Sequence, residues 1–216
     1  MKILLLAATD KEMDAVREEL TELDGKLELE TLISGVGLTA TAYALTKKLQ
    51  HQDYDFVFNF GIAGSFDDEI PIGEVVEIRK EHFADFGAES PEGFLSAFEI
   101  GLCQKDQAPF KEAAIKCAYP KALEGKLEYP KVKGISVNQV HGKDASIEAL
   151  KKRYGKGVES MEGAACFYVC ALEKIPCLQL RAISNRLEPR NRENWEIEKA
   201  LRNLAQAVKF TLKQLV

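Results

Sequence analysis

The chain has 216 residues, a length that suits a single domain with a sizeable apolar core. Apolar residues make up 46% of the chain and charged residues 29%, which is the ordinary balance of a soluble globular protein. The net charge of −5 argues against a surface for nucleic acid or for an anionic membrane.

No apolar run approaches the roughly 18 residues that a membrane span needs. The short apolar segment 3–8 is followed at once by charged residues, so we expect a buried first strand and not a signal peptide. The five cysteines form no CxxC pair and leave one unpaired in any disulfide scheme, which favours a reduced, cytoplasmic protein. Cys166 and Cys170 are one helical turn apart, where a core position is favoured over a metal site.

Apolar segments of strand and helix periodicity alternate along the chain. This alternation predicts an α/β protein with a mainly parallel, mixed sheet that is covered by helices on both faces. Residues 86–130 have weak periodicity, so loops and at most one helix are expected there. The predicted strands are 3–8, 27–34, 56–60, 73–79, 134–140 and 176–183, and the predicted helices are 10–23, 39–49, 145–154, 161–172 and 193–215.

The last predicted strand runs into Asn185. In an α/β protein, ligands bind at the carboxyl ends of parallel strands. The NH2 group of an amide at this place suits a 6-oxopurine, whose N7 and O6 both accept hydrogen bonds, whereas an aspartate suits a 6-aminopurine better. The alternative is a turn former or a helix cap, so other segments have to support the role in binding.

Two carboxylates stand out by their positions. Glu12 follows the first strand, where it is either a general base that activates water or a carboxylate stabilised by the helix dipole. Glu162 enters an otherwise apolar helix beside Met161, and burying it without partners is costly. It suits ribose hydroxyls, which donate to a carboxylate, with the methionine as an apolar surface for the sugar; the alternative is a solvated first-turn glutamate.

Glycine-rich turns follow two of the predicted strands, at 35–37 and 61–64. Glycine there lets backbone N–H groups approach a small ligand closely, although tight turns alone explain it as well. Neither turn matches a dinucleotide-binding or Walker pattern, so a nucleotide-triphosphate or dinucleotide site is unsupported.

Taken in order and spacing, these segments resemble the nucleoside phosphorylase/nucleosidase family, which includes purine nucleoside phosphorylases and methylthioadenosine/S-adenosylhomocysteine nucleosidases. The resemblance runs from residue 1 to about 215 and is weakest over 86–130. It implies one domain over 1–216, with a three-layer α/β/α fold around a central mixed, partly barrel-like sheet. It also implies a homodimer or larger homo-oligomer that needs no cofactor or metal.

The family's chemistry is cleavage of a purine–ribose N-glycosidic bond through an oxocarbenium-like transition state. Carried over by position, Glu12 would orient the attacking water and Glu162 would hold the ribose hydroxyls, with Met161 on the sugar. Val140 would meet the base through its backbone, and Asn185 would face N7. The turn residues Ile62, Ala63 and Gly64 complete the implied substrate-binding set.

Two departures from the family pattern narrow the choice of substrate and of nucleophile. The adenine-specific nucleosidases carry aspartate where this chain has Asn185, which favours a hypoxanthine or guanine base. The phosphorylases offer cationic and hydroxyl groups for phosphate where this chain has Ile72 and Ile62, so water is the favoured nucleophile.

The futalosine hydrolase branch of the family is consistent with both departures. Its members release hypoxanthine from futalosine in menaquinone biosynthesis, and they resemble this chain in an arginine-rich stretch followed by Trp195. Futalosine carries a benzoate at its 5′ end, so Arg190 or Arg192 is a candidate partner for that carboxylate, unless they pair with neighbouring glutamates instead. Phe86 is a candidate for an apolar wall around the aryl group.

Two alternatives remain open at this point. One is a purine nucleoside phosphorylase or an adenine-directed nucleosidase, and the other is a nucleoside-binding protein without turnover. In each case the partner is a small purine nucleoside, and neither nucleic acid nor membrane is expected. His82 and Asp85 are excluded from the predicted site as surface residues, and His141 is either a donor at the pocket edge or a structural histidine.

Overall fold

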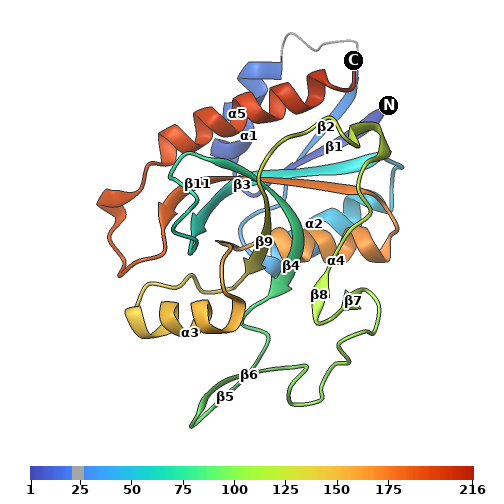
Figure 1. Cartoon of the computed structure of the whole chain (residues 1–216). Helices are drawn as coiled ribbons and strands as arrows, with labels where there is room; N and C mark the ends of the chain where they lie inside the picture. Colours follow the sequence, from blue (N-terminus) through green and yellow to red (C-terminus); the bar gives the residue numbers. More distant parts are fainter. Residues whose placement is uncertain (21–26) are drawn as a thin grey trace.

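The structure, a computed structural model, describes residues 1–20 and 27–216 (Figure 1). Its strands are β1 (Lys2–Ala7), β2 (Glu28–Ile33), β3 (Phe56–Ser65), β4 (Val75–Phe83), β5 (Gly87–Ser90), β6 (Gly93–Ser96), β7 (Phe110–Lys111), β8 (Ala114–Ile115), β9 (Lys131–Ser136), β10 (Val158–Ser160) and β11 (Cys177–Arg186). Its helices are α1 (Asp10–Leu20), α2 (Leu38–Leu49), α3 (Asp144–Tyr154), α4 (Gly163–Leu172) and α5 (Ile197–Lys213), with short 3₁₀ helices η2 (Lys121–Leu123) and η3 (Arg192–Asn194).

Five strands close into a barrel. β3 pairs with β10, β10 with β9, β9 with β4, β4 with β11, and β11 with β3 again. The pairings of β3 with β10 and of β4 with β11 are antiparallel and the other three are parallel. β1 and β2 extend the sheet beyond β3, which confirms the predicted mixed, partly barrel-like sheet.

Helices cover the sheet on two sides, as Figure 1 shows. α1 and α5 pack against each other, and α5 lies on β11 and β3. α2 and α4 pack together on the other side. The three layers are those expected from the alternating sequence pattern, and within the described residues no helix is long and apolar enough to cross a membrane.

β1 shows why a continuous apolar run becomes a central strand. Successive side chains of a strand point to opposite faces of a sheet. Leu4 and Leu6 accordingly pack with α2 and α4, whereas Ile3 and Leu5 pack with α1 and α5. Both faces are buried, so an alternating pattern would have left a polar residue inside one of the two cores.

The structure corrects several predicted bounds. β3 continues through the 61–64 glycine turn to Ser65, and β11 continues past residue 183 to Arg186, because the two strands pair with each other along their whole length. Residues 86–130 form short strands and η2 without an α-helix. The short strand β10 was not predicted. Part of the predicted helix 10–23 lies outside the described residues.

Candidate active site

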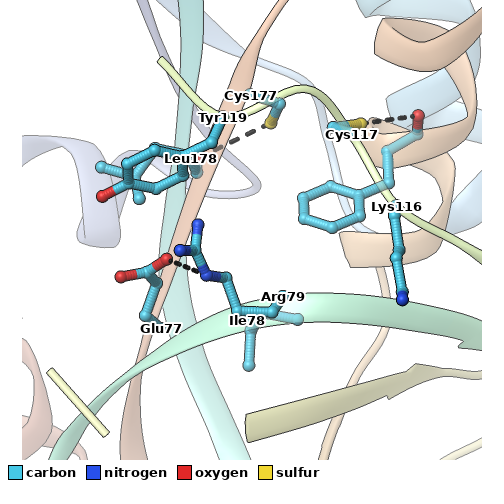
Figure 2. A pocket seen from close by; sticks show the side chains of 9 residues that line it. Glu77, Ile78, Arg79, Lys116, Cys117, Tyr119, Cys177 and Leu178 are labelled. Carbon is cyan, nitrogen blue, oxygen red and sulfur yellow. Dashed lines mark hydrogen bonds and ion pairs between the residues drawn. The ribbon is translucent and has the colours of Figure 1, made fainter. Parts of the chain in front are cut away.

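Two cavities lie at opposite ends of β11. A smaller one of about 270 Å³ lies at its start, among residues that include Arg79, Cys117 and Cys177 (Figure 2). A larger one of about 540 Å³ lies at its carboxyl end, together with the ends of β1, β3 and β10. The predicted site residues that line the larger cavity are Glu12, Ile62, Ala63, Gly64, Val140, Met161, Glu162, Asn185, Arg190 and Arg192.

Glu12 lies in the first turn of α1 with its carboxylate held by three hydrogen bonds. Oε1 accepts from the backbone N–H of Ile62 at 3.0 Å. Oε2 accepts from the backbone N–H and the hydroxyl of Thr9, at 3.1 and 2.8 Å. A buried carboxylate with its orientation fixed in this way can position a water molecule without first having to be ordered.

Arg181 lies behind the cavity wall, next to Glu12, and received no role in the sequence analysis. Its guanidinium is buried in the barrel, where Nη2 donates to Asn59 Oδ1 at 2.7 Å and to Gln179 Oε1 at 3.0 Å. A Cβ atom on Gly61 would lie 2.3 Å from Nη1 of Arg181 and 2.7 Å from Oε1 of Glu12. Gly61 therefore leaves space in which the guanidinium of Arg181 and the carboxylate of Glu12 approach each other. In the sequence, the signal for this role was a charged arginine within an otherwise apolar strand.

Glu162 precedes α4 and is buried at the cavity wall. Its Oε1 accepts from the backbone N–H of Gly37 at 3.0 Å, and Gly37 has a φ of 97°, which favours glycine. Burial raises the pKa of Glu162, and the positive charge of Arg181 opposes that rise. The glycine turn at 35–37 thus serves to hold a buried carboxylate beside Met161.

Asn185 lies at a bulge in the pairing of β11 with β3. Its Oδ1 accepts from the hydroxyl of Ser184 at 2.8 Å, and its Nδ2 donates to the backbone carbonyl of Arg186 at 2.9 Å. These two bonds fix which end of the amide is the oxygen and leave the second N–H of Nδ2 for a ligand. A Cβ on Gly64 would approach this nitrogen to 3.1 Å, so glycine there keeps the amide accessible.

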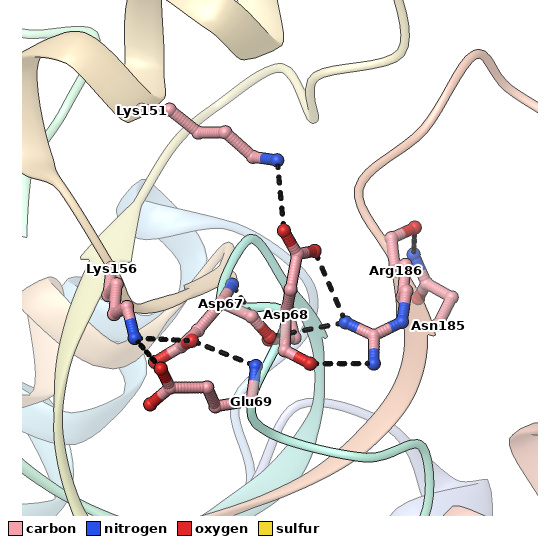
Figure 3. Close-up of polar contacts among 8 residues, drawn as sticks. Asp67, Asp68, Glu69, Lys151, Lys156, Asn185 and Arg186 are labelled. Carbon is pink, nitrogen blue, oxygen red and sulfur yellow. Dashed lines mark hydrogen bonds and ion pairs between the residues drawn. The ribbon is translucent and has the colours of Figure 1, made fainter.

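Arg186 anchors the strand end that carries this amide (Figure 3). Its guanidinium donates to the backbone carbonyls of Asp67 and Asp68, each at 3.2 Å, in the turn between β3 and β4. The carboxylate of Asp68 also lies 3.9 Å from Nζ of Lys151 on α3. The end of β11 is thereby tied to two neighbouring elements.

His141 and Glu159 form a pair at the cavity wall. The backbone N–H of His141 donates to Oε1 of Glu159 at 3.0 Å, and its ring Nδ1 contacts Oε2. Hydrogen bonding to Glu159 raises the pKa of His141. The ring Nδ1 is thus engaged by Glu159 within the protein, while the residue itself lines the cavity.

Arg190 and Arg192 flank the ring of Trp195 at the cavity rim. Their guanidinium carbons lie 5.7 and 5.8 Å from the ring centroid. Contacts of this kind hold a guanidinium in place and leave its N–H groups available. Trp195 also lines the cavity.

Three other residues named in the sequence analysis lie outside the larger cavity. Phe86 is 42% exposed and packs in an aromatic cluster with Phe83 and Phe98. Ile72 is partly buried and packs against a separate apolar cluster of the core. Asp85 accepts a hydrogen bond from the backbone N–H of Asn138 at 2.6 Å, a structural contact consistent with its exclusion from the site.

The sequence and the fold can be compared with those of known proteins. Residues 2–216 match the model of the phosphorylase superfamily. The chain is 32% identical to a futalosine hydrolase of Acidothermus cellulolyticus over 96% of this chain and 88% of that protein. It is 34% identical to a futalosine hydrolase of Streptomyces coelicolor, over 74% of this chain and 66% of that one.

Two solved structures share the fold at low sequence identity. A methylthioadenosine/S-adenosylhomocysteine nucleosidase of Colwellia psychrerythraea in complex with adenine superposes with a TM-score of 0.82 at 22% identity, covering 100% of this chain and 96% of that one. Native futalosine hydrolase of Helicobacter pylori gives a TM-score of 0.79 at 19% identity, covering 100% and 98%. Since the family match spans nearly every residue and the same fold recurs in these structures, the chain belongs to the phosphorylase superfamily.

Proposed function

We propose that this chain hydrolyses the N-glycosidic bond of futalosine and releases hypoxanthine. The observation that carries the proposal is the orientation of Asn185, whose amide oxygen accepts from Ser184 and whose NH2 group has one N–H left for the ligand, the other being bonded to the carbonyl of Arg186. A donor there matches the acceptors N7 and O6 of hypoxanthine. The curated relatives named above are futalosine hydrolases, which supports the same substrate.

The two cavity carboxylates divide the chemistry between them. Glu12 would take a proton from water as the water attacks the anomeric carbon, while Glu162 accepts hydrogen bonds from the ribose hydroxyls. Positive charge develops on the ribose as the glycosidic bond breaks, and both carboxylates stabilise it. Negative charge develops on the leaving purine, where the N–H of Asn185 bonds more strongly as the bond lengthens.

Water is favoured over phosphate as the nucleophile. Ile62 contributes its backbone N–H to Glu12 and presents no hydroxyl or charge, and Ile72 packs against the core. Nη2 of Arg181 is already bonded to Asn59 and Gln179. An oxyanion at this end of the cavity would meet the Glu12 carboxylate, which repels it.

The 5′ benzoate of futalosine would lie at the rim formed by Arg190, Arg192 and Trp195. A guanidinium pairs bidentately with a carboxylate, and the tryptophan ring offers a flat apolar surface to the aryl group. Both cations are positioned by the same ring, at 5.7 and 5.8 Å.

The proposal includes a homodimer or larger homo-oligomer that acts in the cytoplasm. Val36 at the cavity and Tyr43 on α2 are 57% and 68% exposed. A second copy of the chain that packed on this face would bury their apolar surface. Phe86 would then reach the aryl group of a neighbouring copy's substrate, since it lies outside the cavity of its own chain. The five cysteines are free, which suits a reducing compartment.

The test is release of free base from futalosine, inosine and methylthioadenosine, each with and without phosphate. Hypoxanthine released from futalosine at a rate that phosphate does not change is the expected result. Release that requires phosphate would contradict the role given to water, and cleavage of methylthioadenosine alone would identify an adenine-directed nucleosidase.

A further inference from the structure

Three cysteine thiols meet in the core between α4 and β11. The Sγ atoms of Cys166, Cys170 and Cys177 all lie within 4.8 Å of one another, and those of Cys166 and Cys177 are 3.7 Å apart. All three side chains are buried, with exposed fractions of 0%, 0% and 3%. We refer to them as the thiol cluster. Residues 166 and 170 are one turn apart on a helix, but only the fold brings in the third sulfur, from the start of β11.

We propose that the thiol cluster binds a soft monovalent metal ion, Cu(I), in a three-coordinate site. A metal bonded to thiolates at about 2.3 Å places pairs of sulfurs roughly 3.8–4.0 Å apart. The 3.7 Å between the sulfurs of Cys166 and Cys177 is close to that spacing, and the sulfur of Cys170 lies within 4.8 Å of both, so a shift of about 1 Å at most closes the site. Thiolate ligands select soft ions, and a structural zinc ion would require a fourth ligand.

The smaller cavity gives a route to the cluster. Cys177 lines this cavity of about 270 Å³, and Cys117 lies beside it with its thiol donating to the backbone carbonyl of Phe167 at 3.1 Å (Figure 2). A thiol close to the path can take up an ion and pass it on by ligand exchange. The metal therefore does not have to cross a continuous apolar core.

Charged residues line the cavity that leads to the cluster. They are Lys116, Arg79 and Glu77, and the carboxylate of Glu77 lies 2.8 Å from Nε of Arg79. Three thiolates around one Cu(I) carry a net charge of −2, which the charge of Lys116 at the cavity offsets in part. Each thiol that binds metal releases a proton, so binding tightens as pH rises.

This site is separate from the substrate cavity. Cys177 begins β11 and Asn185 lies near its other end, roughly 26 Å away at about 3.3 Å per residue. The inference thus stands whether or not the chain hydrolyses futalosine.

The test is titration of the fully reduced protein with Cu(I) in the presence of a competing chromogenic chelator. One ion per chain is expected, with affinity at least 10-fold weaker in Cys170→Ser and Cys177→Ser. Cys103→Ser is the matched control, because Cys103 lies outside the cluster, and it should bind as the parent does. A parent protein that takes no copper from the chelator, or cluster variants that bind as tightly as the parent, would overturn the proposal.

Two further measurements test whether the variants remain folded and how many sulfur ligands the metal has. Cys170→Ala keeps a small apolar side chain in the core, so it should unfold at nearly the parent's temperature while losing the copper. X-ray absorption should count three sulfur ligands at one distance. Loss of copper on Cys117→Ser, with four sulfurs around the metal of the parent, would contradict a three-cysteine site.

Discussion

At the scale of single residues, the site depends on side chains whose hydrogen bonds are fixed by the protein itself. Glu12, Glu162 and Asn185 each have at least one polar atom bonded to a backbone or hydroxyl group. Such bonds place an acceptor or a donor before the substrate arrives, which lowers the cost of ordering the site during reaction.

Glu12→Gln tests the assignment of the general base. An amide cannot take a proton from water, so kcat for futalosine should fall by roughly 10²–10⁴-fold while the Kd for substrate changes little. Single-turnover kinetics and equilibrium binding separate the two. Asp10→Asn is the matched control, an exposed carboxylate in the same helical turn that should leave kcat unchanged. Unchanged turnover in the Gln variant would remove Glu12 as the base.

Arg190→Gln and Arg192→Gln test the placement of the 5′ group. Loss of a charge-assisted bond should raise the KM for futalosine by about 10-fold or more in at least one variant, because such bonds contribute about 1.5–3 kcal/mol. Inosine lacks the benzoate and should be unaffected. Arg202→Gln, an exposed arginine on α5, serves as control. Equal effects on KM for futalosine and for inosine would contradict the assignment of these arginines to the 5′ group.

At the scale of elements, the pairing of β3 with β11 builds the site. Gly61 and Gly64 lie on β3 opposite Arg181 and Asn185 on β11. The pairing places the polar side chains of β11 beside glycine backbone of β3, where a larger side chain would collide with them. This explains why β3 contains glycines, although strands generally favour branched residues.

Gly61→Ala tests this juxtaposition. The new methyl group would lie 2.3 Å from Arg181 Nη1 and 2.7 Å from Glu12 Oε1, so one of the two must move. A displacement of about 1 Å at a reacting group can cost about 10²-fold, and we expect kcat/KM to fall on that order. Gly125→Ala, whose methyl group would meet open space but whose φ of 72° favours glycine, controls for a general loss of stability on glycine replacement. A fully active Gly61 variant would show that the approach is not needed.

The sequence predicted the elements that depend on local pattern and missed those that depend on partners. The all-apolar run of β1 and the apolar helix α4 were recognisable because both of their faces are buried. β10 was missed because only three residues form it, and its neighbours β3 and β9 determine its pairing. The role of Arg181 was missed for the same reason, because its hydrogen-bond partner Asn59 is distant in the sequence and only the fold brings the two together.

At the scale of the whole molecule, the barrel carries a buried carboxyl that links its stability to pH. Glu81 on β4 accepts from Gln179 Nε2 at 2.8 Å and from Ser136 Oγ at 3.1 Å. Burial raises its pKa from 4.5 to about 7, although these two bonds and Arg181 oppose the rise. The folded state therefore holds this proton more tightly than the unfolded chain does.

Glu81→Gln should remove one part of the pH dependence of stability. Because the folded pKa lies above the unfolded one, the contribution of Glu81 is fully present below pH 4.5 and is lost as pH rises to about 7. The parent should lose roughly 3 kcal/mol of unfolding free energy relative to the variant across that window. Urea unfolding of both proteins at several pH values measures the difference. Parallel pH profiles would contradict the shifted pKa.

The proposed function depends above all on selection of a 6-oxopurine by Asn185. Selection is measured by comparing kcat/KM for futalosine with kcat/KM for its adenine counterpart, which has the same ribose and 5′ group and carries an amine at position 6 of the base. We expect a preference for futalosine of about 10²-fold or more, because an amine at that position turns a donor toward the NH2 group of Asn185. Equal rates, or a preference for the adenine compound, would contradict it.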